Sequence, residues 1–165
     1  RPVELLEAMR LRGCIADGLL SGYGGDTETS VELVDRSECV YLHRALESWL
    51  NPPDFELARR IRATLSKPDL IFGMFISEAL NTSAQYYSSE EDRVLDFSKM
   101  CLPGSEGFWG ANTCKASFEN EEYRAYVADI TRKAMDIRVQ SFIFGQISFQ
   151  DTRRKQAEGI LRTMR

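Results

Sequence analysis

The sequence predicts an α/β fold in which parallel strands alternate with helices. Two apolar segments carry this prediction, residues 70–78 within DLIFGMFISEAL and residues 139–149, VQSFIFGQISF. Neither alternates apolar with polar residues, so both are typical of strands that are covered on both faces. An amphipathic helical segment precedes each strand, at 54–66 and at 119–136. This alternation favours a parallel sheet with right-handed crossovers.

The start of the chain adds two helices and a short strand. Residues 2–12 predict a helix, because a proline suits the first turn and an apolar stripe follows at helical spacing. Residues 14–20, CIADGLL, predict a short strand, and a Gly-rich loop follows it. Asp26 or Thr27 can cap a second helix that runs to about Arg36.

The segment ECVYLHRALESW at 38–49 fits two interpretations. Its first half is typical of a strand, whereas the part from His43 onward could be helical. We favour a strand over residues 39–47, because two prolines follow at 52–53 and break the chain.

A long connection separates the two apolar strands. Residues 81–118 show little periodicity but are rich in Tyr, Phe and Trp. A segment of this length inside a compact domain is usually functional or disordered, and its aromatic content favours an ordered functional loop. A last helix is expected after the final strand, capped by Asp151 or Thr152.

Four strand–helix units can form an open sheet or part of a closed barrel. A complete barrel takes about 250 residues, so a chain of 165 residues would hold about half of one. GYGGDT does not match GxGxxG and lacks the lysine of a phosphate-binding loop, which argues against a nucleotide-binding open sheet. We therefore expect a single domain at 1–165 that forms the first four units of an incomplete (β/α)8 TIM barrel, a fragment of a larger barrel.

Composition excludes several classes of function. Hydrophobic residues make up 43% of the chain, which argues against disorder. The formal charge of −4 argues against a nucleic-acid partner, which normally requires a basic surface. No apolar run reaches the roughly 18 residues that a membrane span needs. With one His and no CxxC motif, we expect no metal site and no cofactor.

The four cysteines allow two disulfides. Cys14 and Cys39 would open successive strands, and the starts of paired strands lie about 4.8 Å apart. Cys101 and Cys114 bracket the Gly-rich segment LPGSEGFWGANT, which a disulfide would hold in place. Two disulfides indicate an oxidising compartment, and so a secreted, periplasmic or cell-surface protein. The alternative is four free thiols that pack as small apolar groups.

Two carboxylates are candidates for catalysis. Glu78 and Glu47 would each lie where a predicted strand ends, and chemistry collects at the carboxyl ends of parallel strands. Cleavage of a glycosidic bond requires two carboxyl groups separated by roughly 5 to 9.5 Å. The alternative is that each residue caps a helix or pairs with an arginine. His43, near the middle of a predicted strand, is expected to be structural rather than a general base.

Other side chains on the same rim or loop suit contacts with a sugar. Aromatic rings can stack on sugar rings, and Gln and Asp can bond to hydroxyl groups. Asp151 has the alternative role of a helix cap, and the aromatic residues could instead form a small core beneath their loop. The candidate substrate-binding residues are Asp17, Tyr86, Trp109, Gln146 and Asp151.

Three runs of sequence resemble one family. FGMFISEAL, FWGANTCKASFENEEYRAYV and VQSFIFGQISFQD are similar to the first strands of secreted (β/α)-barrel glycoside-hydrolase-like proteins. The resemblance covers about residues 69–151 and includes a YxxY pattern, Tyr123 and Tyr126. It implies acid–base cleavage of a polysaccharide or oligosaccharide, with a second carboxylate on a later strand. The large retaining class carries an Asn-Glu pair where this chain has Gln146 and Ile147, which puts a standard retaining mechanism in doubt.

Two other functions remain open at this point. A non-catalytic carbohydrate-binding protein would use the same aromatic side chains without a reactive carboxylate. A small α/β interaction domain would bind no sugar.

Overall fold

The computed structural model describes residues 2–16, 18–23, 25–146, 158 and 161–163. The chain forms two compact units. The first unit comprises 1–47, 53–75 and 134–143, and the second comprises 48–52, 76–133 and 144–165.

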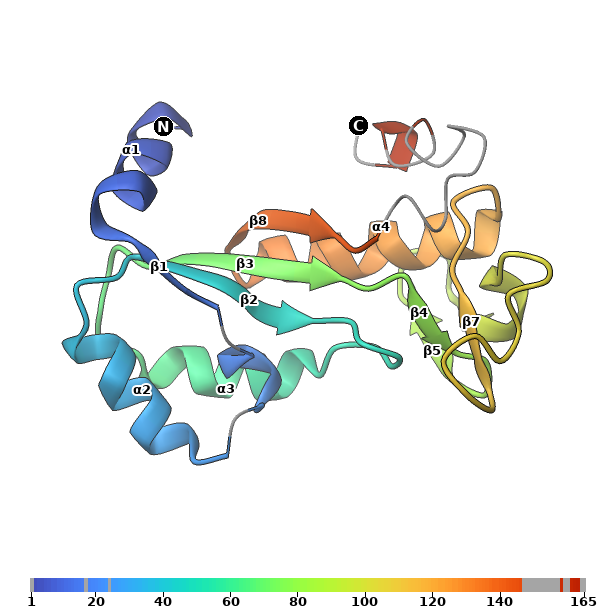
Figure 1. Ribbon diagram of the computed structural model, residues 1–165, viewed down its shortest axis with the longest axis horizontal. Coiled ribbons are helices and arrows are strands. Elements are labelled where there is room, and N and C mark those ends of the chain that lie inside the picture. Colours follow the sequence, from blue (N-terminus) through green and yellow to red (C-terminus); the bar gives the residue numbers. More distant parts are fainter. Residues whose placement is uncertain (1, 17, 24, 147–157, 159–160, 164–165) are drawn as a thin grey trace. The chain divides into compact units, whose positions relative to one another are not determined.

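The first unit is built on a four-stranded sheet in the order β1-β2-β3-β8. β1 pairs with β2, and β2 with β3, in parallel, and the arrow of β8 points the same way as that of β3 (Figure 1). The strands are β1 (Cys14–Ala16), β2 (Tyr41–Glu47), β3 (Ile71–Ile76) and β8 (Val139–Phe144). The helical elements are α1 (Pro2–Arg12), the 3-10 turn η1 (Leu19–Ser21), α2 (Thr27–Arg36) and α3 (Phe55–Thr64).

Local capping explains where α2 and α3 begin. The carboxylate of Asp26 accepts hydrogen bonds from the backbone N–H groups of Glu28 and Thr29, as an N-cap does. Asp54 accepts in the same way from the N–H of Leu57. The predicted starts of both helices are therefore confirmed.

One face of this sheet is buried under helices. In Figure 1, α2 and α3 lie on the same side of the sheet. The guanidinium of Arg62 on α3 stacks over the ring of Phe72 on β3, with its carbon 4.9 Å from the ring centroid. The apolar side chains buried in this unit include Val34, Leu42, Leu46, Ala58, Ile61, Phe72 and Met74.

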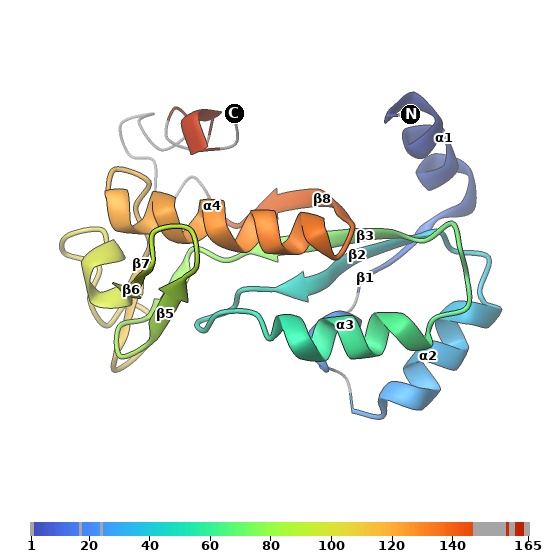
Figure 2. The same ribbon diagram turned by 180° about the vertical axis from the view of Figure 1, so that it is seen from behind.

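The second unit contains two antiparallel ribbons, which are also seen in Figure 2. β4 pairs with β7, and β5 with β6. The elements are β4 (Ala79–Asn81), β5 (Gln85–Ser88), β6 (Arg93–Asp96), the 3-10 turn η2 (Phe97–Met100), β7 (Thr113–Lys115) and α4 (Glu121–Asp136), which belongs to this unit as far as Lys133.

Aromatic rings form much of the core of the second unit. Tyr126 meets the rings of Phe97 and Tyr86 edge-on, with centroids 4.8 and 5.2 Å apart. Phe118 lies 4.7 Å from Tyr123. Because aromatic pairs prefer such tilted geometries, these contacts stabilise the unit beyond simple burial.

The predicted barrel architecture is wrong, although the structure is of the α/β class. The described sheet has four strands and is not closed on itself. The strand–helix repeat is interrupted between β3 and β8, where two antiparallel ribbons stand before α4. The cause is the predicted loop at 81–118, which forms strands of its own.

The predicted strands are also longer than the observed ones. The segment 14–20 forms a strand only to Ala16 and then turns into η1. The segments 39–47 and 70–78 form strands over 41–47 and 71–76. The fourth strand ends at Phe144, and residues 147–149 of the prediction lie outside the described residues, as does most of the last helix.

One predicted disulfide is confirmed and the other is wrong. Cys101 and Cys114 are bonded, with Cα atoms 5.6 Å apart. Cys39 carries a free thiol, so the pair Cys14–Cys39 is not formed. Cys14 stands opposite Tyr41 in the parallel pair, so Cys39 lies before β2 rather than opposite Cys14.

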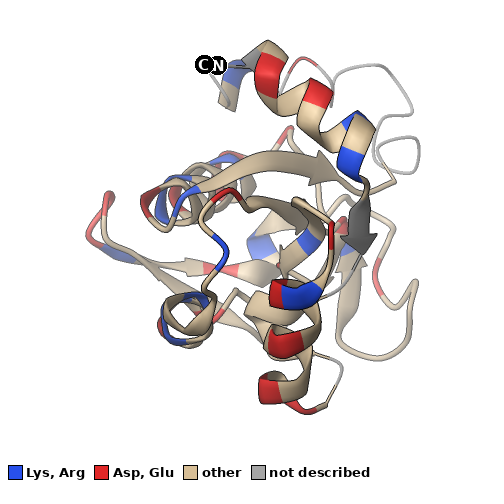
Figure 3. Ribbon diagram, turned by 90° about the vertical axis from the view of Figure 1, so that its left-hand side faces the viewer, with Lys and Arg blue, Asp and Glu red and all other residues tan. Residues whose placement is uncertain are grey.

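Charged side chains are interspersed along the helices (Figure 3). Several pair along one helix, as Glu32 does with Arg36 and Glu56 with Arg59. Within the described part of the chain, no helix is both long enough and apolar enough to cross a membrane.

Candidate functional site

The carboxylate of Glu78 is one of two buried side chains with an unpaired polar atom among the described residues of the second unit, and the other is the hydroxyl of Tyr126. Glu78 follows β3 by two residues and is only 3% exposed. Its Oε2 atom is buried and has no hydrogen-bond partner among the residues that the structure describes. Buried polar atoms are nearly always paired, and an exception often marks a catalytic role or a bound group.

The backbone around Glu78 is rigidly held. The hydroxyl of Ser77 accepts a hydrogen bond from the N–H of Ala79 at 3.0 Å, and the N–H of Ser77 donates to the hydroxyl of Ser48. The carbonyl oxygen of Ser77 accepts from the hydroxyl of Tyr123. The side chain of Glu78 therefore lies on a backbone that is fixed on both sides.

The β4–β7 ribbon ties Glu78 to the disulfide loop. The N–H of Ala116 donates to the carbonyl of Glu78 at 2.7 Å, and Leu80 stands opposite Cys114. Cys114 is bonded to Cys101. The loop that carries Phe108 and Trp109 is thus connected through the ribbon to the backbone of Glu78 in the same unit.

Phe108 and Trp109 form an aromatic corner at the tip of this loop. Their rings meet edge-on at 4.8 Å, and the ammonium of Lys115 lies 3.8 Å from the centroid of the Phe108 ring. Phe108 is 52% exposed, whereas Trp109 is half-buried. The more accessible of the two rings is therefore Phe108 rather than Trp109.

Directly paired residues of an antiparallel ribbon point to the same face of it. Lys115 stands opposite Ala79, the residue after Glu78. Phe108, which contacts Lys115, lies toward that same face. Glu78 itself precedes β4, so the alternation of the ribbon does not set the direction of its carboxylate.

Tyr86 is buried and belongs to a polar network. Its hydroxyl donates to the carboxylate of Asp129, and the ammonium of Lys133 donates to the Tyr86 oxygen at 2.8 Å. Lys133 and Asp129 also form an ion pair at 3.0 Å. Burial and the neighbouring Asp129 carboxylate raise the pKa of Tyr86 far above its ordinary value. This network fixes β5 on α4.

Glu47, the second predicted catalytic residue, lies in the first unit and is paired. Its Oε1 accepts a hydrogen bond from Nε of Arg44 at 2.7 Å, and its side chain is 11% exposed. The backbone N–H of Glu47 donates to the hydroxyl of Ser21. The guanidinium carbon of Arg44 lies 4.1 Å from the centroid of the Phe75 ring.

A bulge in β2 places Arg44 over Phe75. Leu42 pairs with Phe72 and Leu46 with Met74, so three residues of β2 stand opposite Gly73 alone. The three residues of this bulge are His43, Arg44 and Ala45.

Arg44 adopts a left-handed conformation with φ of 58°. Such a conformation is uncommon for a residue other than glycine, and bulges are over-represented beside functional sites.

The single histidine lies on the same bulge. Nδ1 of His43 is 3.1 Å from the hydroxyl of Tyr41, and that hydroxyl is 3.1 Å from the hydroxyl of Ser141 on β8. His43 is thus hydrogen-bonded, in agreement with its expected structural role.

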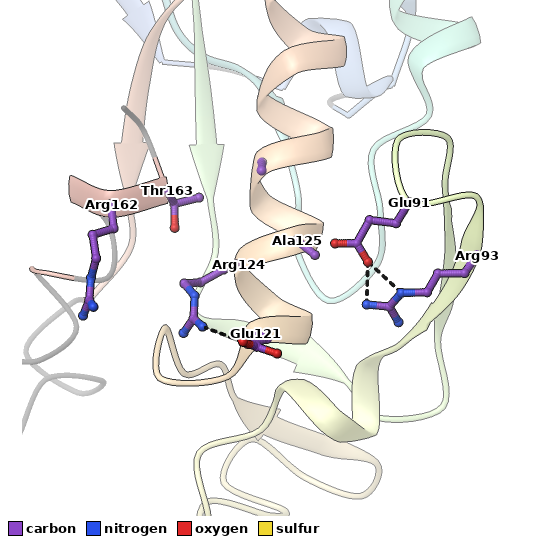
Figure 4. Close-up of a pocket in the computed structure, with 8 residues that line it drawn as sticks. Glu91, Arg93, Glu121, Arg124, Ala125, Arg162 and Thr163 are labelled. Atoms are coloured by element: carbon purple, nitrogen blue, oxygen red, sulfur yellow. Dashed lines mark hydrogen bonds and ion pairs between the residues drawn. The ribbon is translucent and has the colours of Figure 1, made fainter.

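A cavity of about 590 Å3 lies beside α4 in the second unit (Figure 4). Arg93 is paired with Glu91 and Glu122, and Arg124 donates to the backbone carbonyl of Phe118. The lining charges are therefore largely satisfied, so this cavity is a weaker candidate than Glu78. Its lining residues are Glu91, Arg93, Glu121, Arg124, Ala125, Ala128, Arg162 and Thr163.

Of the remaining predicted residues, the structure describes only Gln146. Gln146 is exposed after β8. Asp17 and Asp151 lie outside the described residues. Their roles stay predictions.

Sequence reasoning missed Arg44 and Asp129. Both are charged residues within predicted elements, and nothing in their local sequence distinguishes them from surface charges.

Comparison of the chain with protein-family models, with curated proteins and with solved structures finds no match.

Proposed function

We propose that this protein acts on carbohydrate and that Glu78 is a carboxyl group that catalyses cleavage of a glycosidic bond. The supporting observation is its buried Oε2 atom, which has no partner within the described part of the chain. Keeping such a group unpaired costs stability, and proteins retain costly groups mainly where function needs them.

The chemistry requires a proton at the glycosidic oxygen. As general acid, Glu78 would give its proton to that oxygen while the bond to the anomeric carbon breaks. Water then adds its oxygen to the anomeric carbon and releases a proton to a second carboxylate. The predicted second carboxylate, Glu47, lies in the first unit and is ion-paired with Arg44, so the proposal assigns no role to it.

The disulfide Cys101–Cys114 supports secretion as part of this proposal, since such bonds persist in oxidising compartments. It also holds Phe108 and Trp109 in one place, which suits stacking against a sugar ring.

The test is turnover of a panel of aryl glycosides and soluble polysaccharides by the wild-type protein and by Glu78→Gln. This substitution keeps the size of the side chain and removes the acid. We expect turnover to fall at least 100-fold, in line with the usual contribution of general acid–base catalysis. Glu121→Gln is the matched control, since the Glu121 side chain is 94% exposed in the same unit. Equal turnover by wild type and Glu78→Gln would disprove the role of Glu78.

A second candidate is carbohydrate binding without catalysis, favoured by the exposed ring of Phe108. It predicts that the wild-type protein binds sugar without turnover, that Phe108→Ala weakens binding, and that Glu78→Gln leaves binding unchanged.

A further inference from the structure

We propose that the bulge of β2 is a binding site for the carboxylate group of a small ligand, and that Arg44 recognises this group. The proposal concerns the first unit alone and does not rest on the role of Glu78.

The first argument is that the backbone brings Arg44 out of the regular strand. Three residues face Gly73, and Arg44 takes the left-handed conformation with φ of 58°. The ion pair between Arg44 and Glu47, which are three residues apart, does not itself require a left-handed backbone. A strained backbone at a non-glycine residue is found mainly at ligand sites and active sites, where the surrounding structure maintains it.

The second argument is that the guanidinium is held before any ligand arrives. The ring of Phe75 lies beneath it at 4.1 Å, and the carboxylate of Glu47 binds Nε at 2.7 Å. Glu47 is itself fixed through its backbone bond to Ser21. A side chain that is already oriented loses little conformational entropy on binding, which favours affinity.

The third argument is that the outward donors of Arg44 are available. A guanidinium carries five N–H donors, and Glu47 takes the one on Nε. Among the residues that the structure describes, the Nη1 and Nη2 groups hydrogen-bond to none, and the side chain is 39% exposed. Two parallel N–H groups in this geometry match the two oxygens of a carboxylate.

The charge balance favours a carboxylate over a phosphate. Glu47 offsets part of the positive charge of Arg44, so the site attracts a singly charged anion more than a doubly charged one. The phenol of Tyr23 lies near Glu47, whose charge, together with burial, raises the Tyr23 pKa. Tyr23 therefore stays neutral and adds no charge to the site.

The test is calorimetric titration of the protein with glucuronate, with glucose and glucose 6-phosphate in parallel at one ionic strength. We expect glucuronate to bind at least ten-fold more tightly than glucose. Arg44→Lys should lose at least ten-fold in affinity, because an ammonium cannot bind both oxygens with a planar fork. The double variant Arg44→Gln/Glu47→Gln removes both charges together, so no carboxylate is left unpaired, and it should lose binding.

Arg59→Lys is the control, since Arg59 pairs on the exposed face of α3 and should leave the affinity unchanged. Failure of glucuronate to bind the wild-type protein, or unchanged affinity in the double variant or in Arg44→Lys, would overturn the proposal. Tighter binding of glucose 6-phosphate than of glucuronate would overturn the assignment to a carboxylate.

Discussion

The hydroxyl of Tyr41 lies 3.1 Å from the hydroxyl of Ser141, although one hundred residues separate them in the chain. Tyr41 is on β2 and Ser141 on β8, with β3 between these strands. The contact is possible because Gly73 on β3 has no side chain. A Cβ atom there would lie 3.2 Å from the Tyr41 hydroxyl.

Gly73→Ala should therefore destabilise the protein. The added methyl would also lie 3.2 Å from the Leu42 carbonyl oxygen and 3.3 Å from the Arg44 nitrogen, and neither backbone atom can move freely. Overpacking of this kind costs about 1–3 kcal/mol of unfolding free energy, which urea denaturation would measure. Ser141→Ala, which removes only the hydrogen bond, should cost about 1 kcal/mol. An unchanged free energy of unfolding in Gly73→Ala would contradict the close packing around Gly73.

Glu78→Gln should keep or increase stability. A buried carboxylate oxygen without a partner is costly, and an amide replaces it with a neutral group of the same size. We expect the free energy of unfolding to rise by about 1 kcal/mol, because groups needed for function are often retained at a cost in stability. Thermal denaturation at pH 7 would measure it, with Glu121→Gln as the exposed control. A marked loss of stability would indicate that the Glu78 carboxylate has a structural role.

The disulfide should stabilise the second unit. Cys101 and Cys114 are 13 residues apart, and closing a loop of this size contributes about 3 kcal/mol in the chain-entropy view. The double variant Cys101→Ser/Cys114→Ser should lose about 2–3 kcal/mol in urea denaturation. Cys39→Ser, which removes a free thiol, should change stability little. Equal stability of the double variant and the wild type would show that the loop is held by its other contacts.

Tyr86 should make stability fall in alkaline solution. Its pKa is raised above the ordinary value of 10.0 by burial and by Asp129. Above pH 10 the Tyr86 hydroxyl of the unfolded chain loses its proton, whereas the same hydroxyl in the folded protein keeps it. Unfolding free energy should therefore be at its full value below pH 10 and fall as the pH rises above it.

Tyr86→Phe should reduce this dependence, and it should cost about 1–3 kcal/mol at pH 7 because Asp129 and Lys133 lose a partner. Ile130→Val is the control, since it removes a buried methylene without changing any titrating group. Urea denaturation between pH 8 and pH 11 would measure all three proteins. A constant difference between wild type and Tyr86→Phe across this range would contradict the raised pKa.

Several features were predictable because short-range physics sets them. Asp26 and Asp54 accept hydrogen bonds from N–H groups two or three residues ahead, so the starts of α2 and α3 are encoded locally. The apolar run after Asp69 predicted a buried strand, and β3 is that strand. Cys101 and Cys114 bracket a Gly-rich loop that needs a covalent link.

The structure of residues 81–118 could not be predicted from local patterns in this way. Their strands are three or four residues long; β5 and β6 pair with each other, whereas β7 pairs with β4 across the whole segment. Tyr86 and Tyr87 are adjacent aromatic residues, yet the first is buried and the second is 55% exposed. The inward one, Tyr86, packs on Tyr126 and bonds to Asp129, 43 residues away, and neither contact can be read from the local sequence.

The sequence by itself thus determined the helices α1 to α4, the central strand and one disulfide, because each depends on neighbouring residues or on simple apolar patterning. Tertiary structure alone decided the bulge at Arg44, since it depends on the register between β2 and β3 and on the space left by Gly73. It also decided that the Glu47 carboxylate is paired and that Oε2 of Glu78 has no partner among the described residues. Pairing of charges depends on which distant side chains the fold brings within hydrogen-bond distance, and no local pattern encodes that distance.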